Sequence, residues 1–140
     1  MRLGPVLLAG ALALSGCGKS DTPATDAPDT AAAPEPTVAP TAAMGEQVFK
    51  RGLACHTIDK GGANGIGPNL HGIVGRAVAS HEGFNYSSAM KAHGGVWDDA
   101  ALDSYLTSPA KAIPGNRMTF FGIADAADRK ALILYLGAQK

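Results

Sequence analysis

A thiol and an imidazole stand side by side in this sequence, at Cys55 and His56, and a thioether follows much later at Met118. A thiol beside an imidazole is suited to nucleophilic attack with a neighbouring base, and all three side chains are metal ligands. The only other cysteine, Cys17, is far upstream. Two such distant cysteines exclude a disulfide-dense scaffold and a zinc site made entirely of thiolates.

These residue types alone admit an enzyme or a copper carrier. An enzyme would use Cys55 as nucleophile and His56 as base, but sequence neighbours rarely reach productive geometry, and no third orienting group is evident. A copper carrier would use Cys55, His56 and Met118. Blue-copper sites need two histidines and a cysteine, normally on a β-sandwich, and neither the ligand spacing nor a strand pattern is present.

The elements that must position these residues are short predicted helices. The stretch 45–51 begins the first helix, with Val48 and Phe49 as its apolar edge. A glycine-rich loop without clear periodicity follows over 59–72. No alternating strand pattern of useful length occurs in the sequence.

Two later helices carry cap signals. Asp98 or Asp99 can cap a helix that ends near Pro109, and Asp125 can cap the last helix. The apolar residues at helical spacing are Leu102, Tyr105 and Leu106 in one helix, and Leu132, Tyr135 and Leu136 in the other.

The predicted core is thin. Fewer than about 100 residues form these helices and loops, and aromatic residues make up only 6% of the chain. Such a chain often needs a metal or a large cofactor inside it. The net charge of zero argues against a nucleic-acid-binding protein, which usually has a basic surplus.

The first sixteen residues read as a targeting segment. Arg2 supplies the positive end, and the apolar stretch 3–14 is too short to span a bilayer, which takes about 20 residues. The stretch ends in Leu-Ser-Gly-Cys at 14–17, which resembles the lipobox of bacterial lipoproteins. That resemblance implies cleavage before Cys17 and acylation of its thiol, hence a membrane anchor. The alternative is an ordinary secretory signal with an incidental cysteine.

Residues 17–43 form a predicted disordered tether behind the lipidated Cys17. The segment consists mostly of Ala, Thr, Pro and Asp, and Val38 is almost its only bulky apolar residue. It cannot bury enough surface to offset the entropy lost on ordering. As a coil it would reach about 30 Å, and fully extended about 80 Å.

Further segments accompany the Cys-His pair in a fixed order. They are 67–76, 83–91, 95–98, 102–106, 113–122 and 132–136. In this order and spacing the chain resembles the class I cytochromes c over residues 45–137, and their attachment motif Cys-x-x-Cys-His ends in the same pair. The resemblance implies an all-α fold, with short helices and long loops wrapped around one haem over 44–140. It also implies a single-electron carrier that is not an enzyme.

The resemblance assigns roles around the iron. His56 and Met118 are the implied axial ligands, and a thioether favours Fe(II) and raises the potential. The carbonyl of Pro68 accepts a hydrogen bond from the His56 ring, and Tyr105 donates to the axial sulfur. By itself, Met118 would be read as a core methionine.

Other positions serve the haem periphery in the family. Tyr86 and Trp97 correspond to donors to a haem propionate, and Arg76 to the residue that balances its charge. A solvated surface role for Arg76 stays open. Phe120 would pack beside the haem edge. Gly45, Phe49, Leu132 and Tyr135 are similar to the crossing of the first and last helices, while His71, His81 and His93 match no ligand role.

Gly52 departs from the family motif, because a cysteine is expected there. Only one thioether is then possible, through Cys55. Four interpretations stay open: a haem held by one thioether and two axial ligands, a non-covalent haem, a haem-free degenerate domain acting as a binding or regulatory lipoprotein, and a change or error in the sequence. The first is favoured because every other haem-site position is present.

The resemblance also implies partners and a location. A cytochrome bc-type complex would be the donor and a terminal oxidase or reductase the acceptor, at the periplasmic face of a membrane in the bacterial cell envelope. A monomer is expected. The docking surface would surround the haem edge near Lys50, Arg51, Lys111 and Arg117, where charges either steer acidic partners or merely aid solubility.

Overall fold

The computed structural model describes residues 38–140, which belong to one compact unit. The predicted signal peptide 1–16, the lipidation site Cys17 and the tether up to residue 37 lie outside the described residues. Within 38–140, no helix has the length and apolar character needed to cross a membrane.

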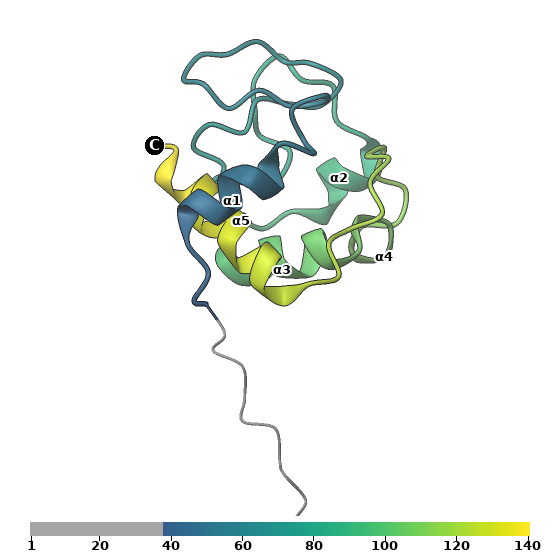
Figure 1. Ribbon diagram of the computed structural model, residues 1–140. Helices are drawn as coiled ribbons and strands as arrows, with labels where there is room; N and C mark the ends of the chain where they lie inside the picture. Colours follow the sequence, from purple (N-terminus) through teal and green to yellow (C-terminus); the bar gives the residue numbers. More distant parts are fainter. Residues whose placement is uncertain (1–37) are drawn as a thin grey trace, which may run out of the picture. The chain divides into compact units, whose positions relative to one another are not determined.

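The described chain folds into helices joined by long loops (Figure 1). The helices are α1 (Ala42–Phe49), α2 (Ser88–His93), α3 (Asp99–Thr107), α4 (Pro109–Ala112) and α5 (Ala126–Ala138). Residues 38–140 contain no strand, and a single isolated bridge joins Ala77 to Val96. The all-α prediction is therefore confirmed.

Side-chain caps decide where the three predicted helices begin. The Asp98 carboxylate accepts the N–H of Ala101 at 2.8 Å, so Asp98 and not Asp99 caps α3. Asp125 caps α5 in the same way. Helix α1 begins at Ala42, earlier than predicted, because the Thr41 hydroxyl accepts the N–H of Met44 and satisfies an end of the helix.

Two short helices were not predicted from the sequence. Helix α2 starts after Ser87, whose hydroxyl accepts the N–H of Met90, and it ends at His93, before Gly94 with its φ of 70°. Helix α4 starts at Pro109, because proline suits the first helical position. Pro109 therefore begins a new helix as well as following the end of α3.

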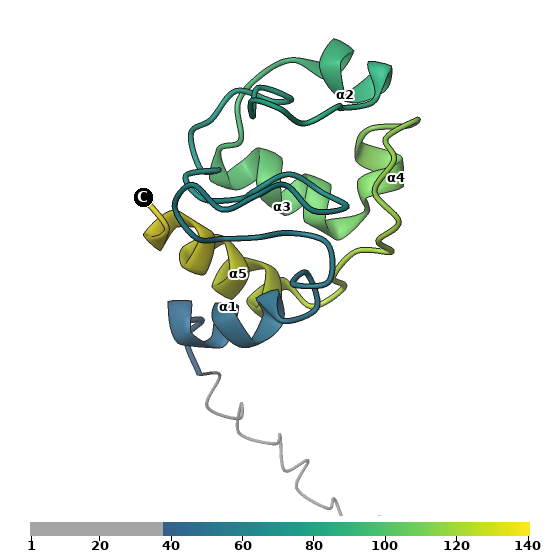
Figure 2. The same cartoon turned by 90° about the horizontal axis from the view of Figure 1, so that it is seen from above.

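Helices α1 and α5 pack against each other at Gly45 (Figure 2). A Cβ at Gly45 would overlap the backbone carbonyl of Ala131 and lie 2.7 Å from the Cβ of Tyr135. Next to this contact, the rings of Phe49 and Tyr135 lie with centroids 5.5 Å apart. The predicted crossing of the first and last helices is confirmed, and it depends on the missing side chain at residue 45.

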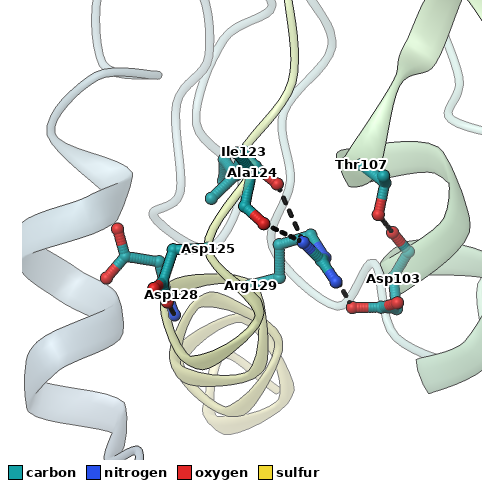
Figure 3. A network of polar contacts seen from close by, with 7 residues as sticks. All are labelled: Asp103, Thr107, Ile123, Ala124, Asp125, Asp128 and Arg129. Carbon is teal, nitrogen blue, oxygen red and sulfur yellow. Dashed lines mark hydrogen bonds and ion pairs between the residues drawn. The ribbon is translucent and has the colours of Figure 1, made fainter. Parts of the chain in front are cut away.

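Arg129 joins α5 to α3 and to the segment before α5 (Figure 3). Its Nε lies 2.7 Å from the Asp103 carboxylate, and its Nη1 donates to the carbonyls of Ile123 and Ala124 at 2.9 Å. The Arg129 side chain is almost buried, so these bonds satisfy a charge largely removed from water. They hold the chain that leads from Met118 into α5.

The core gathers side chains from the helices and from the loops, and α4 contributes buried Pro109 and half-buried Ala112 at its border. Its buried members include Val48, Phe49, Ile73, Met90, Trp97, Leu102, Tyr105, Ile113, Ile123, Leu132, Ile133 and Leu136. Met118 and Phe120 are half-buried against this cluster.

Candidate functional site

The turn after α1 places residues 52, 55 and 56 on one face. The N–H groups of Cys55 and His56 both donate to the carbonyl of Gly52, at 2.9 and 2.8 Å. Residues three and four apart on such a turn point the same way. Cys55 and His56 are both half-buried.

The His56 ring is held by a backbone carbonyl. Its Nδ1 atom lies 2.7 Å from the oxygen of Pro68. Because a carbonyl only accepts, Nδ1 must carry the proton, and in the neutral ring Nε2 keeps its lone pair. Burial lowers the pKa of His56, and the bond to Pro68 opposes this in part. His56 is therefore held as a neutral imidazole with Nε2 available as a donor atom.

Gly67 forms a close support for the same ring. A Cβ at this position would overlap the His56 ring and lie 2.6 Å from Nδ1. The N–H of Gly67 donates to the carbonyl of Cys55 at 2.8 Å, and its own carbonyl accepts the N–H of Gly65. The loop is thus fastened to Cys55 by a backbone bond and to the His56 ring through the Pro68 carbonyl.

Asn69 holds this loop from within, a role not foreseen from the sequence. Its side chain is among the most buried polar groups, at 2% exposed. Nδ2 donates to the Thr57 hydroxyl at 2.7 Å and to the Asp59 carbonyl at 3.0 Å, while Oδ1 accepts the N–H of His71. Its place directly after Gly-Pro, where asparagine commonly organises loops, was the available signal.

Met118 is positioned by Asn116, a second residue that sequence reasoning missed. The Asn116 Oδ1 accepts the N–H of Met118 at 2.8 Å, and its Nδ2 donates to the carbonyls of Pro109 and Ile113, each at 2.8 Å. Asparagine after Pro-Gly is a typical turn residue, which was the signal. The loop that carries Met118 is therefore fastened to α4.

Tyr105 approaches Met118 from α3. Its hydroxyl lies 4.0 Å from the sulfur, and burial raises the pKa of Tyr105 to about 12. The hydroxyl thus stays protonated at neutral pH and can only donate towards the thioether. The Tyr105 ring packs on buried Trp97, with centroids 5.0 Å apart.

Arg76 is bound to the loop rather than free in solvent. Its guanidinium donates to the carbonyls of His71 and Asn69, both at 3.1 Å, and one nitrogen lies 3.3 Å from Nδ1 of His81. Burial lowers the pKa of Arg76 and raises that of Tyr86, and Arg76 opposes the shift of Tyr86 in part. Tyr86 is half-buried and packs edge-on against Phe84, with centroids 4.8 Å apart.

The space around Gly52 does not require glycine. Its φ is not among the positive values, and a Cβ would meet the Phe49 carbonyl at 3.3 Å and the Phe49 ring at 3.5 Å. That contact is tight but needs only a small shift. A cysteine at this position would lie on the same face as Cys55 and His56.

The donor set fits a haem better than a metal held by side chains alone. Among residues 38–140, no three side chains of His, Cys, Asp or Glu gather to hold an ion, so the set for a blue-copper site is absent there. Haem iron needs only two axial donors, and a neutral imidazole and a thioether are a known pair. The His56 ring lies against Gly67 and is bonded through Nδ1 to Pro68. Its Nε2 atom has no hydrogen-bond partner among the described residues, which suits a bond to haem iron.

The comparisons with known proteins agree with this assignment. The family model described as Cytochrome c matches residues 42–140. The chain is 48% identical over 101 residues to the cytochrome c-type cyt cy of Rhodobacter capsulatus, covering 71% of this chain and spanning half the length of that protein. It is 44% identical over 96 residues to cytochrome c2 of Rhodoblastus acidophilus, covering 69% of this chain and 90% of the relative.

A solved structure shows the same fold. Cytochrome cH from Methylobacterium extorquens superposes with a TM-score of 0.66 and 39% sequence identity. The match covers 70% of this chain and 98% of the other.

Proposed function

This chain belongs to the cytochrome c family, whose members bind c-type haem and are electron carriers rather than enzymes, and from that premise we propose that it carries single electrons in a bacterial respiratory chain. The proposed haem is ligated axially by His56 and Met118. The observation that carries the proposal is the His56 ring, held by the Pro68 carbonyl with its Nε2 available.

The haem, when bound, would supply the one-electron change between Fe(III) and Fe(II). His56 would provide a neutral imidazole, because its Nδ1 proton is committed to Pro68. Met118 would provide the soft thioether that favours the reduced state. Tyr105, protonated at neutral pH, would donate to that sulfur and hold its orientation.

Cys55 would provide the single covalent link. Gly52 has no side chain to react, although the turn would place one beside Cys55. Tyr86 and Trp97 would donate to a haem propionate, and Arg76 would balance its charge. Phe120, half-buried near Met118, would cover the haem edge.

The residues between Cys17 and α1 would tether this domain to a membrane; the predicted boundary at residue 43 is corrected, because Ala42 and Ala43 belong to α1. Lipidation at Cys17, after removal of residues 1–16, would anchor the chain at the periplasmic face, and the segment up to residue 41 would give the domain reach. Diffusion near the membrane suits a carrier between a cytochrome bc-type complex and a terminal oxidase or reductase.

Partner docking would use the surface around the haem edge. Lys50, Arg51, Lys111 and Arg117 are all exposed. Phe121 is fully exposed directly after Phe120 and would add an apolar contact for a partner. We expect the domain to dock as a monomer, with rates that fall as salt screens the charges.

Two measurements on the mature full-length protein test this function. A mass spectrum reports the acyl chains on Cys17 and the covalent haem together. The spectrum of the pyridine adduct reports the number of thioethers, and one link predicts bands between those of two-thioether and two-vinyl haems. Gly52→Cys is the matched variant and should move the bands to the two-thioether positions.

Each contrary result removes a different part of the proposal. A compact but colourless mature protein contradicts the electron-carrier function and supports the haem-free alternative. A haem that can be extracted with an organic solvent contradicts the proposed thioether, but no other part of the proposal. A mature mass without acyl chains contradicts the lipid anchor and supports an ordinary secretory signal.

A further inference from the structure

His81 touches the guanidinium of Arg76, although no function has been assigned to this histidine so far. The two nitrogens, Nδ1 of His81 and Nη1 of Arg76, are 3.3 Å apart. Because Arg76 carries only donors, Nδ1 must accept in this contact, and the ring must be neutral with its proton on Nε2. His81 thus completes the hydrogen bonds of Arg76 beside the carbonyls of His71 and Asn69.

The surroundings of His81 contain few other charged or titratable groups. Partial burial and, next to it, Arg76 lower the pKa of His81, and the adjacent Glu82 opposes this in part. Burial raises the pKa of Tyr86, while nearby Arg76 and the backbone of His81 oppose this shift. These contacts link His81, Arg76 and Tyr86 into one cluster, defined here as the Arg76 cluster.

We propose that His81 is a positioning residue that makes the reduction potential depend on pH by acting through Arg76. This inference rests on the proposed function, in which Arg76 and Tyr86 serve the haem carboxylates. At a pH above the pKa of His81, the neutral ring accepts a hydrogen bond from Arg76 and holds the guanidinium in place. At a pH below this pKa, the protonated ring cannot accept this bond and adds a second positive charge beside Arg76.

The sign of the effect follows from this charge. A proton on His81 stabilises the reduced haem, which carries one positive charge less than the oxidised form. The electron comes from the donor, and the proton is taken up from solvent at His81. The potential therefore falls as the pH rises through the titration, which lies below the ordinary histidine value of 6.5 because burial and Arg76 both disfavour the cation.

The magnitude is small because His81 is only partly buried. We expect reduction of the haem to raise the proton affinity of His81 about twofold. A change of this size is typical of two charges that interact through solvent. That factor corresponds to a fall of about 18 mV, since tenfold is about 59 mV for one electron.

Redox titration of the full-length haem protein tests the inference. It covers about pH 4.5 to 8, on both sides of the ordinary pKa of histidine. His81→Gln should abolish this step in the potential. His93→Gln, which changes an exposed histidine in α2, should leave the step unchanged. An NMR titration should also give a higher His81 pKa in the ferrous protein than in the ferric protein.

The outcomes separate this inference from the proposed function. A normal His/Met haem spectrum with a potential that is independent of pH, or a step that persists in His81→Gln, overturns the role of His81 alone. Equal His81 pKa values in the two redox states do the same. A protein that binds no haem overturns both proposals, and its absorption spectrum reveals this before any potential is measured.

Discussion

The two sides of the proposed iron site are built differently. On the His56 side, the ring is bonded to the Pro68 carbonyl and lies against Gly67, and the buried side chain of Asn69 holds the loop that carries both. On the other side, Met118 is held by one hydrogen bond from its N–H to the Asn116 side chain, and the Tyr105 hydroxyl approaches its sulfur at 4.0 Å.

This difference has a dynamic consequence. Opening the His56 side requires breaking several backbone bonds and exposing a buried asparagine. Opening the Met118 side requires the displacement of one half-buried loop. Local opening takes the route with the fewest buried contacts and bonds, so the Met118 side should release its ligand first.

Removal of the weaker ligand should have the largest effect. Met118→Ala leaves the iron without its thioether, so the ferrous protein should bind carbon monoxide. The potential should fall by on the order of 200 mV, a part of the ~0.8 V range set by axial ligands. Absorption spectra and redox titration measure both effects. Met90→Leu, at a buried methionine of α2, is the control, and an unchanged spectrum in Met118→Ala would exclude Met118 as ligand.

Overpacking the His56 side should have the next largest effect. In Gly67→Ala the new Cβ overlaps the His56 ring, and the free energy of unfolding should drop by about 1–3 kcal/mol. Gly137→Ala is the matched control, because its Cβ would meet only Val74 at 3.9 Å within helix α5. The control should stabilise the protein by up to about 1 kcal/mol. Guanidinium unfolding compares them, and equal midpoints would contradict the close support of His56.

Matched asparagine variants probe the contrast directly. Asn116→Ala leaves the N–H of Met118 without its acceptor, so opening of the Met118 side should cost about 1.4 kcal/mol less and cyanide should bind about tenfold more tightly. Asn69→Ala should destabilise the fold by about 1–3 kcal/mol but leave cyanide affinity nearly unchanged. Equal cyanide affinities in the two variants would contradict the proposed difference between the sides.

Filling a cavity beside the Met118 side should give the smallest effect. A cavity of about 180 Å³ is lined by residues that include Trp97, Tyr105, Ala112 and Ile113. Ala112→Leu should fill part of it and stabilise the fold by about 1 kcal/mol. It should also slow cyanide binding, because α4 supports Asn116. Thermal unfolding and stopped-flow mixing measure these changes, and a lower melting temperature would show that the cavity cannot accept the side chain.

The predictable part of the fold depends on local signals. Asp125 and one of the pair Asp98 and Asp99 were expected as caps, because a cap acts on an N–H only a few residues away. The short helices α2 and α4 were not foreseen, since six or four residues are too few to show periodicity.

The residues of the candidate site likewise fall into a group that could be named from the sequence and a group that could not. His56, Met118 and their family partners could be named from residue type, order and spacing. Asn69, Asn116 and the contact between Arg76 and His81 could not, although the asparagines carried weak turn signals. Their partners come from other segments, and a hydrogen bond between loops leaves no periodic trace in the sequence.

The sequence by itself determined the candidate ligand types, the single thiol of the domain, the helix caps and a thin core, because each depends on composition or on near neighbours. Only the tertiary structure decided which nitrogen of His56 is free, which glycine must lack a side chain against that ring, and that His81 meets Arg76. These features depend on distances between atoms that folding brings together, and no local rule specifies such distances.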